Sequence, residues 1–188
     1  MRPDLPTERY DLFSQVLHWL TAVAVTIGFI LGPGDFGRLM RQGVDPATRS
    51  DIVWHESLGL LVLVLTLTRL VWVARRPQRP RFALPLWMDR SSRSVQIVLW
   101  FLLLALPITA LLSLGSEGHP LTVLGGLRID RMPLIEASGV GKLADWGDVH
   151  GWLGDVLIWL AGFHALAALY HQFVLKDGVL RAMLPGRR

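Results

Sequence analysis

Cysteine is absent from the 188 residues of this chain, and charged residues are scarce at 18%. The lack of cysteine excludes disulfides, thiolate metal ligands, iron–sulfur clusters and the C-x-x-C-H attachment of c-type haem. The charged fraction is too low for a disordered chain and lies below the ~25% of an average globular domain. Hydrophobic residues instead make up 52% of the sequence. These proportions indicate an integral membrane protein.

Four apolar stretches are long enough to cross a bilayer, which takes ~20 helical residues. They cover approximately residues 14–31, 52–74, 95–114 and 151–175. Their apolar residues form continuous runs without a period of two, so we expect helices whose backbone groups are hydrogen-bonded within each span. The sequence therefore predicts an all-α fold, an integral membrane four-helix bundle that forms a single domain over residues 1–188.

Basic residues are distributed unequally between the two membrane faces. We define side A as the face that carries the N-terminus, the 75–94 link and the C-terminus, and side B as the face that carries the 32–51 and 115–150 loops. Side A holds 13 of the 19 basic residues: Arg2, Arg9, Arg69, Arg75, Arg76, Arg79, Arg81, Arg90, Arg93, Lys176, Arg181, Arg187 and Arg188. Because basic residues at span ends favour the cytoplasm, we expect both termini to be cytoplasmic, in a bacterial cytoplasmic (inner) membrane. This placement explains the net charge of +4 by contact with the lipid bilayer, and we expect no nucleic-acid partner.

Histidine is concentrated in the predicted spans. Five of the six histidines lie in or at the edge of a span, and His119 lies in a loop. The five are His18, His55, His150, His164 and His171. Ionisable residues inside a membrane are costly and mark functional sites.

The topology sorts these histidines by depth. His150 and His164 are 14 residues apart, which places them within ~40° of one helix face and about 21 Å apart along the axis. The direction of each span puts His55 near side B with His150, and His18 near side A with His164. The sequence thus predicts two bis-histidine sites at different depths. Spacing by itself also allows His171, seven residues after His164, as the partner of His18.

Pairs of imidazoles suit haem iron in a helical bundle, whereas a zinc site takes three or four ligands at one depth. Without cysteine the haem has to be noncovalent, so we expect two b-type haems. Arg69 lies about two turns inside the second span, where it either contacts a haem propionate or quinone head group, or extends to the interface. His171, where it is not a ligand, is a second candidate contact for a propionate or quinone. Asp155 either orients an imidazole, carries a quinone proton or faces water.

Three segments resemble the prokaryotic cytochrome b561 family, a set of four-helix di-haem membrane proteins. They are RYDLFSQVLHWL around His18, IVWHESLGLLVLVLTLTRL around His55 and Arg69, and the stretch from DVHGWLGDVLIWLAGFHALAALYHQF to the C-terminal end. The resemblance covers nearly the whole chain and is weakest in the 115–150 loop. It implies that His18, His55, His150 and His164 are the axial haem ligands.

The same resemblance implies electron transfer that involves ubiquinone or another membrane quinone, and a family member oxidises superoxide at the periplasmic face. We therefore expect a membrane cytochrome that moves electrons between a periplasmic-side donor, with superoxide as a candidate, and quinone, as an oxidoreductase or an electron carrier. The sequence assigns no catalytic residue. Side B has a net charge of −4, so its cations would have to cluster locally to attract an anion. Two alternatives are the haem-b anchor subunit of a larger quinone-linked oxidoreductase and a haem-free proton-coupled transporter.

Overall fold

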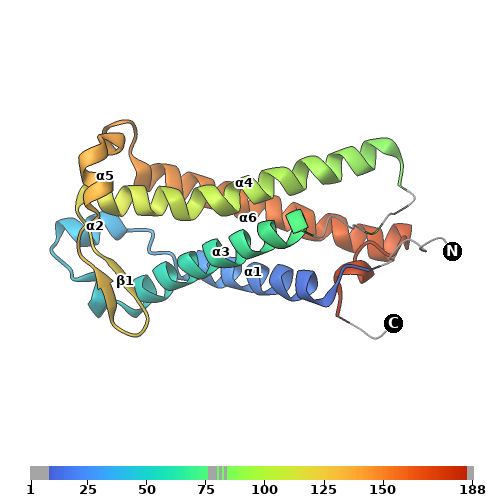
Figure 1. The fold of residues 1–188 in the computed structure, drawn as a ribbon, viewed down its shortest axis with the longest axis horizontal. Coiled ribbons are helices and arrows are strands. Elements are labelled where there is room, and N and C mark those ends of the chain that lie inside the picture. Colours follow the sequence, from blue (N-terminus) through green and yellow to red (C-terminus); the bar gives the residue numbers. More distant parts are fainter. Residues whose placement is uncertain (1–8, 76–79, 81, 83, 186–188) are drawn as a thin grey trace.

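The computed structural model describes residues 9–75, 80, 82 and 84–185. Its four long helices form an elongated bundle (Figure 1). They are α1 (Leu12–Leu31), α3 (Ser50–Arg75), α4 (Leu86–Glu117) and α6 (Trp146–Tyr170). Each is long and apolar enough to cross a membrane, α6 together with the π-helical turn η3 (His171–Leu175) that continues it. The predicted all-α membrane bundle is confirmed.

The helices pack as two pairs. α1 lies against α3 and α4 lies against α6, and α3 also contacts α4, whereas α1 and α6 contact each other little. Buried apolar side chains are correspondingly few, among them Leu17, Ile52 and Leu102. Most large apolar side chains face outward, as expected for helices whose outer surfaces meet lipid.

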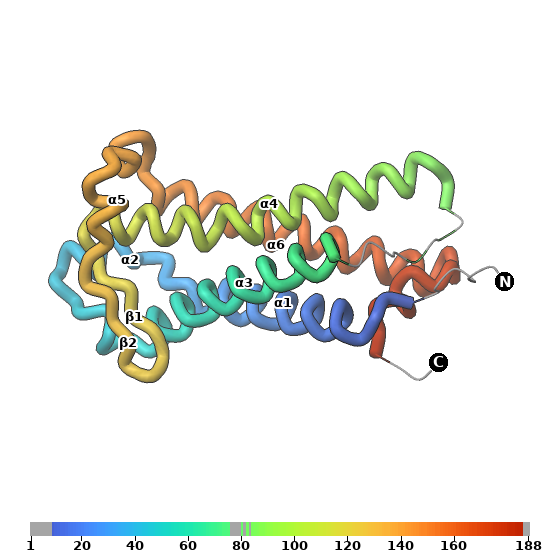
Figure 2. The backbone as a smooth tube through the Cα atoms, viewed as in Figure 1, coloured from blue at the N-terminus to red at the C-terminus, as the bar shows by residue number. Residues whose placement is uncertain are grey.

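The described ends of the chain lie together at one end of the bundle (Figure 2). The backbone N–H of Tyr10 donates to the carbonyl of Ala182 at 3.1 Å, and the Gln15 amide donates to the same carbonyl at 3.1 Å. The indole N–H of Trp19 donates to the carbonyl of Met183 in η4 (Arg181–Met183) at 2.8 Å. This end is side A. Six basic residues assigned to it, Arg2, Arg76, Arg79, Arg81, Arg187 and Arg188, lie outside the described residues.

The third long helix begins earlier than its apolar stretch. α4 starts at Leu86, nine residues before the predicted span, and its first turns are polar, with an ion pair of 2.9 Å between Arg93 and Asp89. Hydropathy marks the part of a helix that lies in lipid, but hydrogen bonding continues into water. Here it extends back to Pro85, whose carbonyl accepts the Asp89 N–H at 3.1 Å and before which the α conformation is disfavoured. The other three predicted spans differ from their helices by a few residues.

Side B carries a small folded cap over the bundle. It contains α2 (Phe36–Arg41), η1 (Pro46–Thr48), a hairpin of β1 (Leu121–Val123) and β2 (Leu127–Ile129), α5 (Pro133–Ser138) and η2 (Val140–Lys142). The hairpin turn uses Gly125 and Gly126, both with positive φ. After η2, Asp145 caps α6 by accepting the Asp148 N–H at 3.0 Å.

Candidate functional site

The side-B histidines come from two helices that do not follow each other in sequence. His55 lies near the start of α3 and His150 near the start of α6. Their ring centroids are 6.0 Å apart, and the ring planes are nearly perpendicular, at 82°. Both side chains are half-buried.

Backbone carbonyls orient both side-B rings. The Nδ1–H of His55 donates to the carbonyl of Gly28 at 2.8 Å, and the Nδ1–H of His150 donates to that of Leu106 at 2.9 Å. Gly28 lies in the last turn of α1, where carbonyls lack a helical partner. With Nδ1 protonated, each ring presents the lone pair of Nε2, which is the form that binds a metal.

Glycine allows α1 to approach His55 this closely. A Cβ at Gly32 would lie 3.3 Å from His55 Cε1. A Cβ at Gly59, one turn after His55 on α3, would meet no described atom within 4 Å. The α1 backbone is therefore close to the His55 ring, and the space beside Gly59 is open.

The side-A histidines have nearly the same separation with different neighbours. The ring centroids of His18 on α1 and His164 on α6 are 6.4 Å apart, with a 75° angle between the planes. Nη1 of Arg69 lies 3.4 Å from Nδ1 of His18. The Arg69 guanidinium also lies over the Trp100 ring, 5.1 Å from its centroid. Of the two alternatives for Arg69, its position favours the bundle interior over the interface.

These separations test the fit of a haem between each pair. A transition metal binds an imidazole nitrogen at about 2.0–2.1 Å, which with ~1.1 Å from nitrogen to ring centroid places two opposite ligands roughly 6.3 Å apart. A tetrahedral ion would bring the centroids to roughly 5 Å. The observed 6.0 and 6.4 Å fit opposite axial positions.

Two further observations agree with this fit. Among the described residues, His, Asp and Glu do not gather in groups of three or more suited to a bare metal ion. The hydroxyl of Thr66, one turn before Arg69 on α3, is buried without a hydrogen-bond partner in the described part of the chain. Buried hydroxyls are seldom left without a partner, so this one agrees with a polar group of a bound molecule nearby. The residues present therefore suit two flat, bis-imidazole cofactors.

His171 belongs to a different cluster on side A. Its Nδ1–H donates to the carboxylate of Asp177 at 2.5 Å, and both side chains are largely buried. The π-helical turn η3 begins at His171 and ends before Lys176, which has a positive φ of 54°. A pocket of about 430 Å³ adjoins this turn, lined by Gln172, Phe173, Lys176, Gly178 and Arg181.

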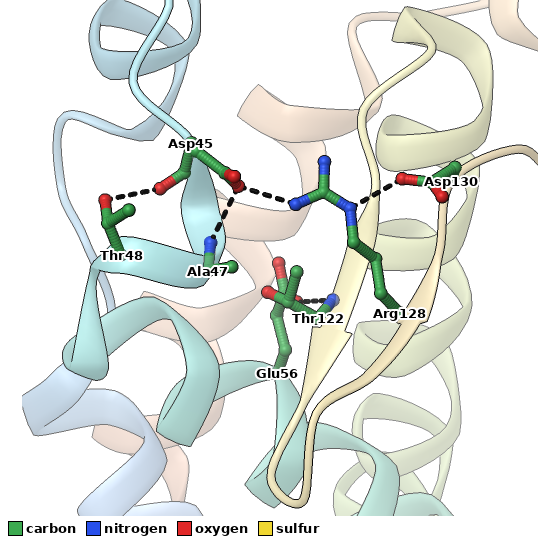
Figure 3. A network of polar contacts seen from close by, with 7 residues as sticks. All are labelled: Asp45, Ala47, Thr48, Glu56, Thr122, Arg128 and Asp130. Atoms are coloured by element: carbon green, nitrogen blue, oxygen red, sulfur yellow. Dashed lines mark hydrogen bonds and ion pairs between the residues drawn. The ribbon is translucent and has the colours of Figure 1, made fainter.

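The side-B cap is fastened to α3 by hydrogen bonds (Figure 3). One carboxylate oxygen of Glu56 accepts the backbone N–H of Thr122 at 2.5 Å and its hydroxyl at 2.9 Å. The hydroxyl of the next residue, Ser57, accepts the N–H of Leu124 at 2.9 Å. Glu56 follows His55 directly, so the hairpin is tied to the same helical turn as this histidine.

Arg128 joins the hairpin to the loop after α2. It contacts Asp45 at 2.7 Å and Asp130 at 2.5 Å (Figure 3). The Ala47 N–H and then Arg128 lower the pKa of Asp45, and hydrogen bonds with Asp130 and Asp45 raise the pKa of Arg128. Four of the six side-B basic residues lie in such ion pairs: Arg38, Arg49, Arg128 and Arg131. Most positive charge on side B is therefore balanced locally.

Asp155 does not orient an imidazole among the described residues, since Leu106 holds His150. It is exposed on the outer face of α6, in a shallow groove between Trp152 and Trp159.

A sequence model described as prokaryotic cytochrome b561 matches residues 9–186. The chain belongs to the prokaryotic cytochrome b561 family. It is 30% identical to "Cytochrome b561 homolog 2" of Escherichia coli (strain K12), over 94% of this chain and 92% of that protein. It is also 30% identical to "Probable superoxide oxidase CybB" of Yersinia pestis, over 96% and 98%. "Cytochrome b562" of Cereibacter sphaeroides is 28% identical over 95% and 96%. The chain is thus a multi-pass membrane cytochrome that transfers electrons through haem b.

The structure brings together the same histidine pairs that the predicted depths group in this cytochrome. Sequence reasoning missed the groups around them: the Gly28 and Leu106 carbonyls, Trp100 and Asp177. Backbone carbonyls leave no signal in a sequence. The hairpin did leave a signal in the sequence, because Gly125-Gly126 separates two β-branched, apolar segments in a way typical of a tight turn.

Proposed function

We propose that this cytochrome holds two b haems, one between His55 and His150 and the other between His18 and His164. The observation that carries the proposal is the pair of centroid separations, 6.0 and 6.4 Å, each suited to opposite axial positions on one iron. The haems supply the one-electron chemistry. The chain supplies the ligands, and its carbonyls at Gly28 and Leu106 fix the tautomer of the side-B rings.

A quinone site on side A is the second part of the proposal. A quinone takes up two electrons and two protons, and two haems match the two electrons. The His171–Asp177 pair can hold and move a proton at Nδ1, and the adjoining pocket offers Gln172, Lys176 and Arg181 as polar contacts for a head group. Arg69 remains the candidate contact for a haem propionate or the quinone itself.

The distribution of charge supports one orientation of the protein in the membrane. The excess of basic residues on side A supports a cytoplasmic location for both termini, in a bacterial inner membrane, with side B facing the periplasm. The donor then reaches the protein at the side-B cap. Superoxide is the first candidate, since one relative is named a probable superoxide oxidase. Because most side-B cations are paired with carboxylates, we expect little long-range attraction of this anion.

The deciding experiment is a haem measurement on the purified protein. We expect two haems b per chain with a low-spin reduced spectrum, and a colourless, folded preparation would contradict the proposal. Stopped-flow reduction by superoxide, with and without ubiquinone, then tests the donor and the acceptor. We expect haem reduction by superoxide to depend weakly on salt and reoxidation to require quinone. Co-purification with a soluble metalloprotein, together with no reaction toward superoxide, would instead indicate an anchor subunit.

A further inference from the structure

We infer that Arg69 makes the side-A haem site the stronger electron acceptor of the two, so that electrons pass downhill from side B to side A. The inference rests on the proposed function, because it requires one haem at each histidine pair. It adds an order of reduction potentials to the proposed transfer from side B to side A and assigns that order to one positioning residue. The two histidine pairs differ in the groups that face Nδ1.

Neutral carbonyl oxygens face the side-B rings. The Nδ1–H groups of His55 and His150 donate to the carbonyls of Gly28 and Leu106, at 2.8 and 2.9 Å. An acceptor at Nδ1 draws the proton away from the ring and increases the basicity of Nε2. A more basic axial ligand stabilises oxidised iron, so this site holds an added electron less strongly.

A cation faces His18 on side A. Nη1 of Arg69 is 3.4 Å from Nδ1, and guanidinium can donate hydrogen bonds but accept none. For Nε2 of His18 to bind iron, Nδ1 has to carry the proton, so Arg69 then faces an N–H and accepts nothing from it. Arg69 therefore cannot increase the basicity of His18 as a carbonyl does. Its positive charge also attracts an added electron at the neighbouring iron, and this attraction is strong in a medium of low dielectric constant. Both effects raise the reduction potential of the side-A site above that of the side-B site.

The protein holds the Arg69 charge in this position. Arg69 lies six residues before the end of α3, which is about 9 Å along the helix axis. Its guanidinium lies over the Trp100 ring, and cation–π contacts of this kind favour Arg. Guanidinium stays protonated under all ordinary conditions, so the bias does not depend on pH.

The resulting order of potentials agrees with the placement of the other groups. The proposed donor reaches side B, where the ion-paired cap lies, and the His171–Asp177 pair and its pocket lie on side A. An electron that enters at the His55–His150 site would thus move toward Arg69 and toward the proposed quinone site.

Redox titration of the purified holoprotein tests this inference. His55→Ala retains the side-A haem, and His164→Ala retains the side-B haem. We expect the haem left in His55→Ala to be reduced at the higher potential. In the full protein, Arg69→Gln should lower the midpoint potential of the higher-potential haem by at least about 59 mV. This corresponds to a tenfold change in the equilibrium constant of a one-electron couple. The lower-potential haem should stay unchanged.

Arg75→Gln, which removes an exposed charge at the end of the same helix, is the matched control and should shift neither potential. A reversed order in the single-haem variants would overturn the inference, as would an equal shift of both haems or no shift in Arg69→Gln. If Arg69→Gln fails to bind the side-A haem, the order in the His variants still decides. One haem per chain would contradict the proposed function, whereas two haems in the reverse order would contradict this inference alone.

Discussion

The two histidine pairs have almost the same internal geometry and very different surroundings. On side B the rings are fixed by carbonyls from two other helices, and the hairpin is fastened to the turn that carries His55. On side A the pair lies beside a guanidinium, close to the hydrogen-bonded chain ends. In the proposed di-haem protein, the ring separation would set which metal centre can bind, and the neighbours at Nδ1 would set how strongly each centre holds an electron.

The largest expected effect is the loss of one haem at a time. His55→Ala and His150→Ala should each remove the side-B haem, and His18→Ala and His164→Ala should each remove the side-A haem, because a missing axial ligand leaves the iron held on one side. Haem content and the reduced spectrum measure this. His119→Ala and His171→Ala should retain both haems. Loss of a haem in His171→Ala with both haems kept in His164→Ala would reassign the side-A ligand.

The next effect concerns the cap on side B. Glu56→Ala leaves the buried N–H and hydroxyl of Thr122 without their acceptor, at a cost of about 1–3 kcal/mol. We expect faster hydrogen exchange at Thr122, faster proteolysis of the hairpin and faster reduction of the side-B haem by a small reagent. Asp130→Asn, which removes an exposed carboxylate from the same segment, is the control. Equal change at both haems would show that the cap does not protect side B specifically.

On side A, a smaller effect is expected at the start of α1. Asp11 caps this helix by accepting the Ser14 N–H at 3.0 Å, and it accepts the Trp72 indole N–H at 3.1 Å. Burial raises the pKa of Asp11, but the hydrogen bonds from Ser14 and Trp72 outweigh it and leave the pKa below its ordinary value. Asp11→Ala should cost about 1 kcal/mol at neutral pH, as N-cap losses do.

The pH dependence of Asp11 follows from the sign of this shift. A lowered pKa means that the stabilisation is complete above the unfolded value of about 3.9 and is lost as the pH falls through the folded pKa. Thermal unfolding followed by haem absorbance should therefore separate wild type from Asp11→Ala at pH 7 and bring them together in acid. A constant difference across this range would contradict a charged cap.

The smallest effect is expected for the exposed ion pair between Asp45 and Arg128. Ion pairs in water contribute little and are screened by salt. Asp45→Asn should change the thermal midpoint slightly at low salt and not at high salt, and acid should remove the difference because the pKa of Asp45 is lowered. A salt-independent change would indicate that the Ala47 contact, rather than Arg128, stabilises the loop.

The sequence predicted the four spans and the histidine pairing because both depend on one-dimensional quantities. Continuous apolar length marks a span, and the position of His18 or His150 along its span gives its depth. It did not predict the start of α4 at Leu86 or the hairpin at Leu121–Ile129, which are formed in water where hydropathy carries little information. The sequence also did not predict the groups that accept the histidine Nδ1–H, since these are main-chain carbonyls of neighbouring helices.

By itself the sequence determined that this protein crosses a membrane four times and groups four histidines at two depths, because burial in lipid restricts the backbone to helices and helix direction converts position into depth. The tertiary structure decided what each imidazole faces. That depends on how helices rotate and approach one another, which brought the Gly28 carbonyl to His55 and the Arg69 guanidinium to His18.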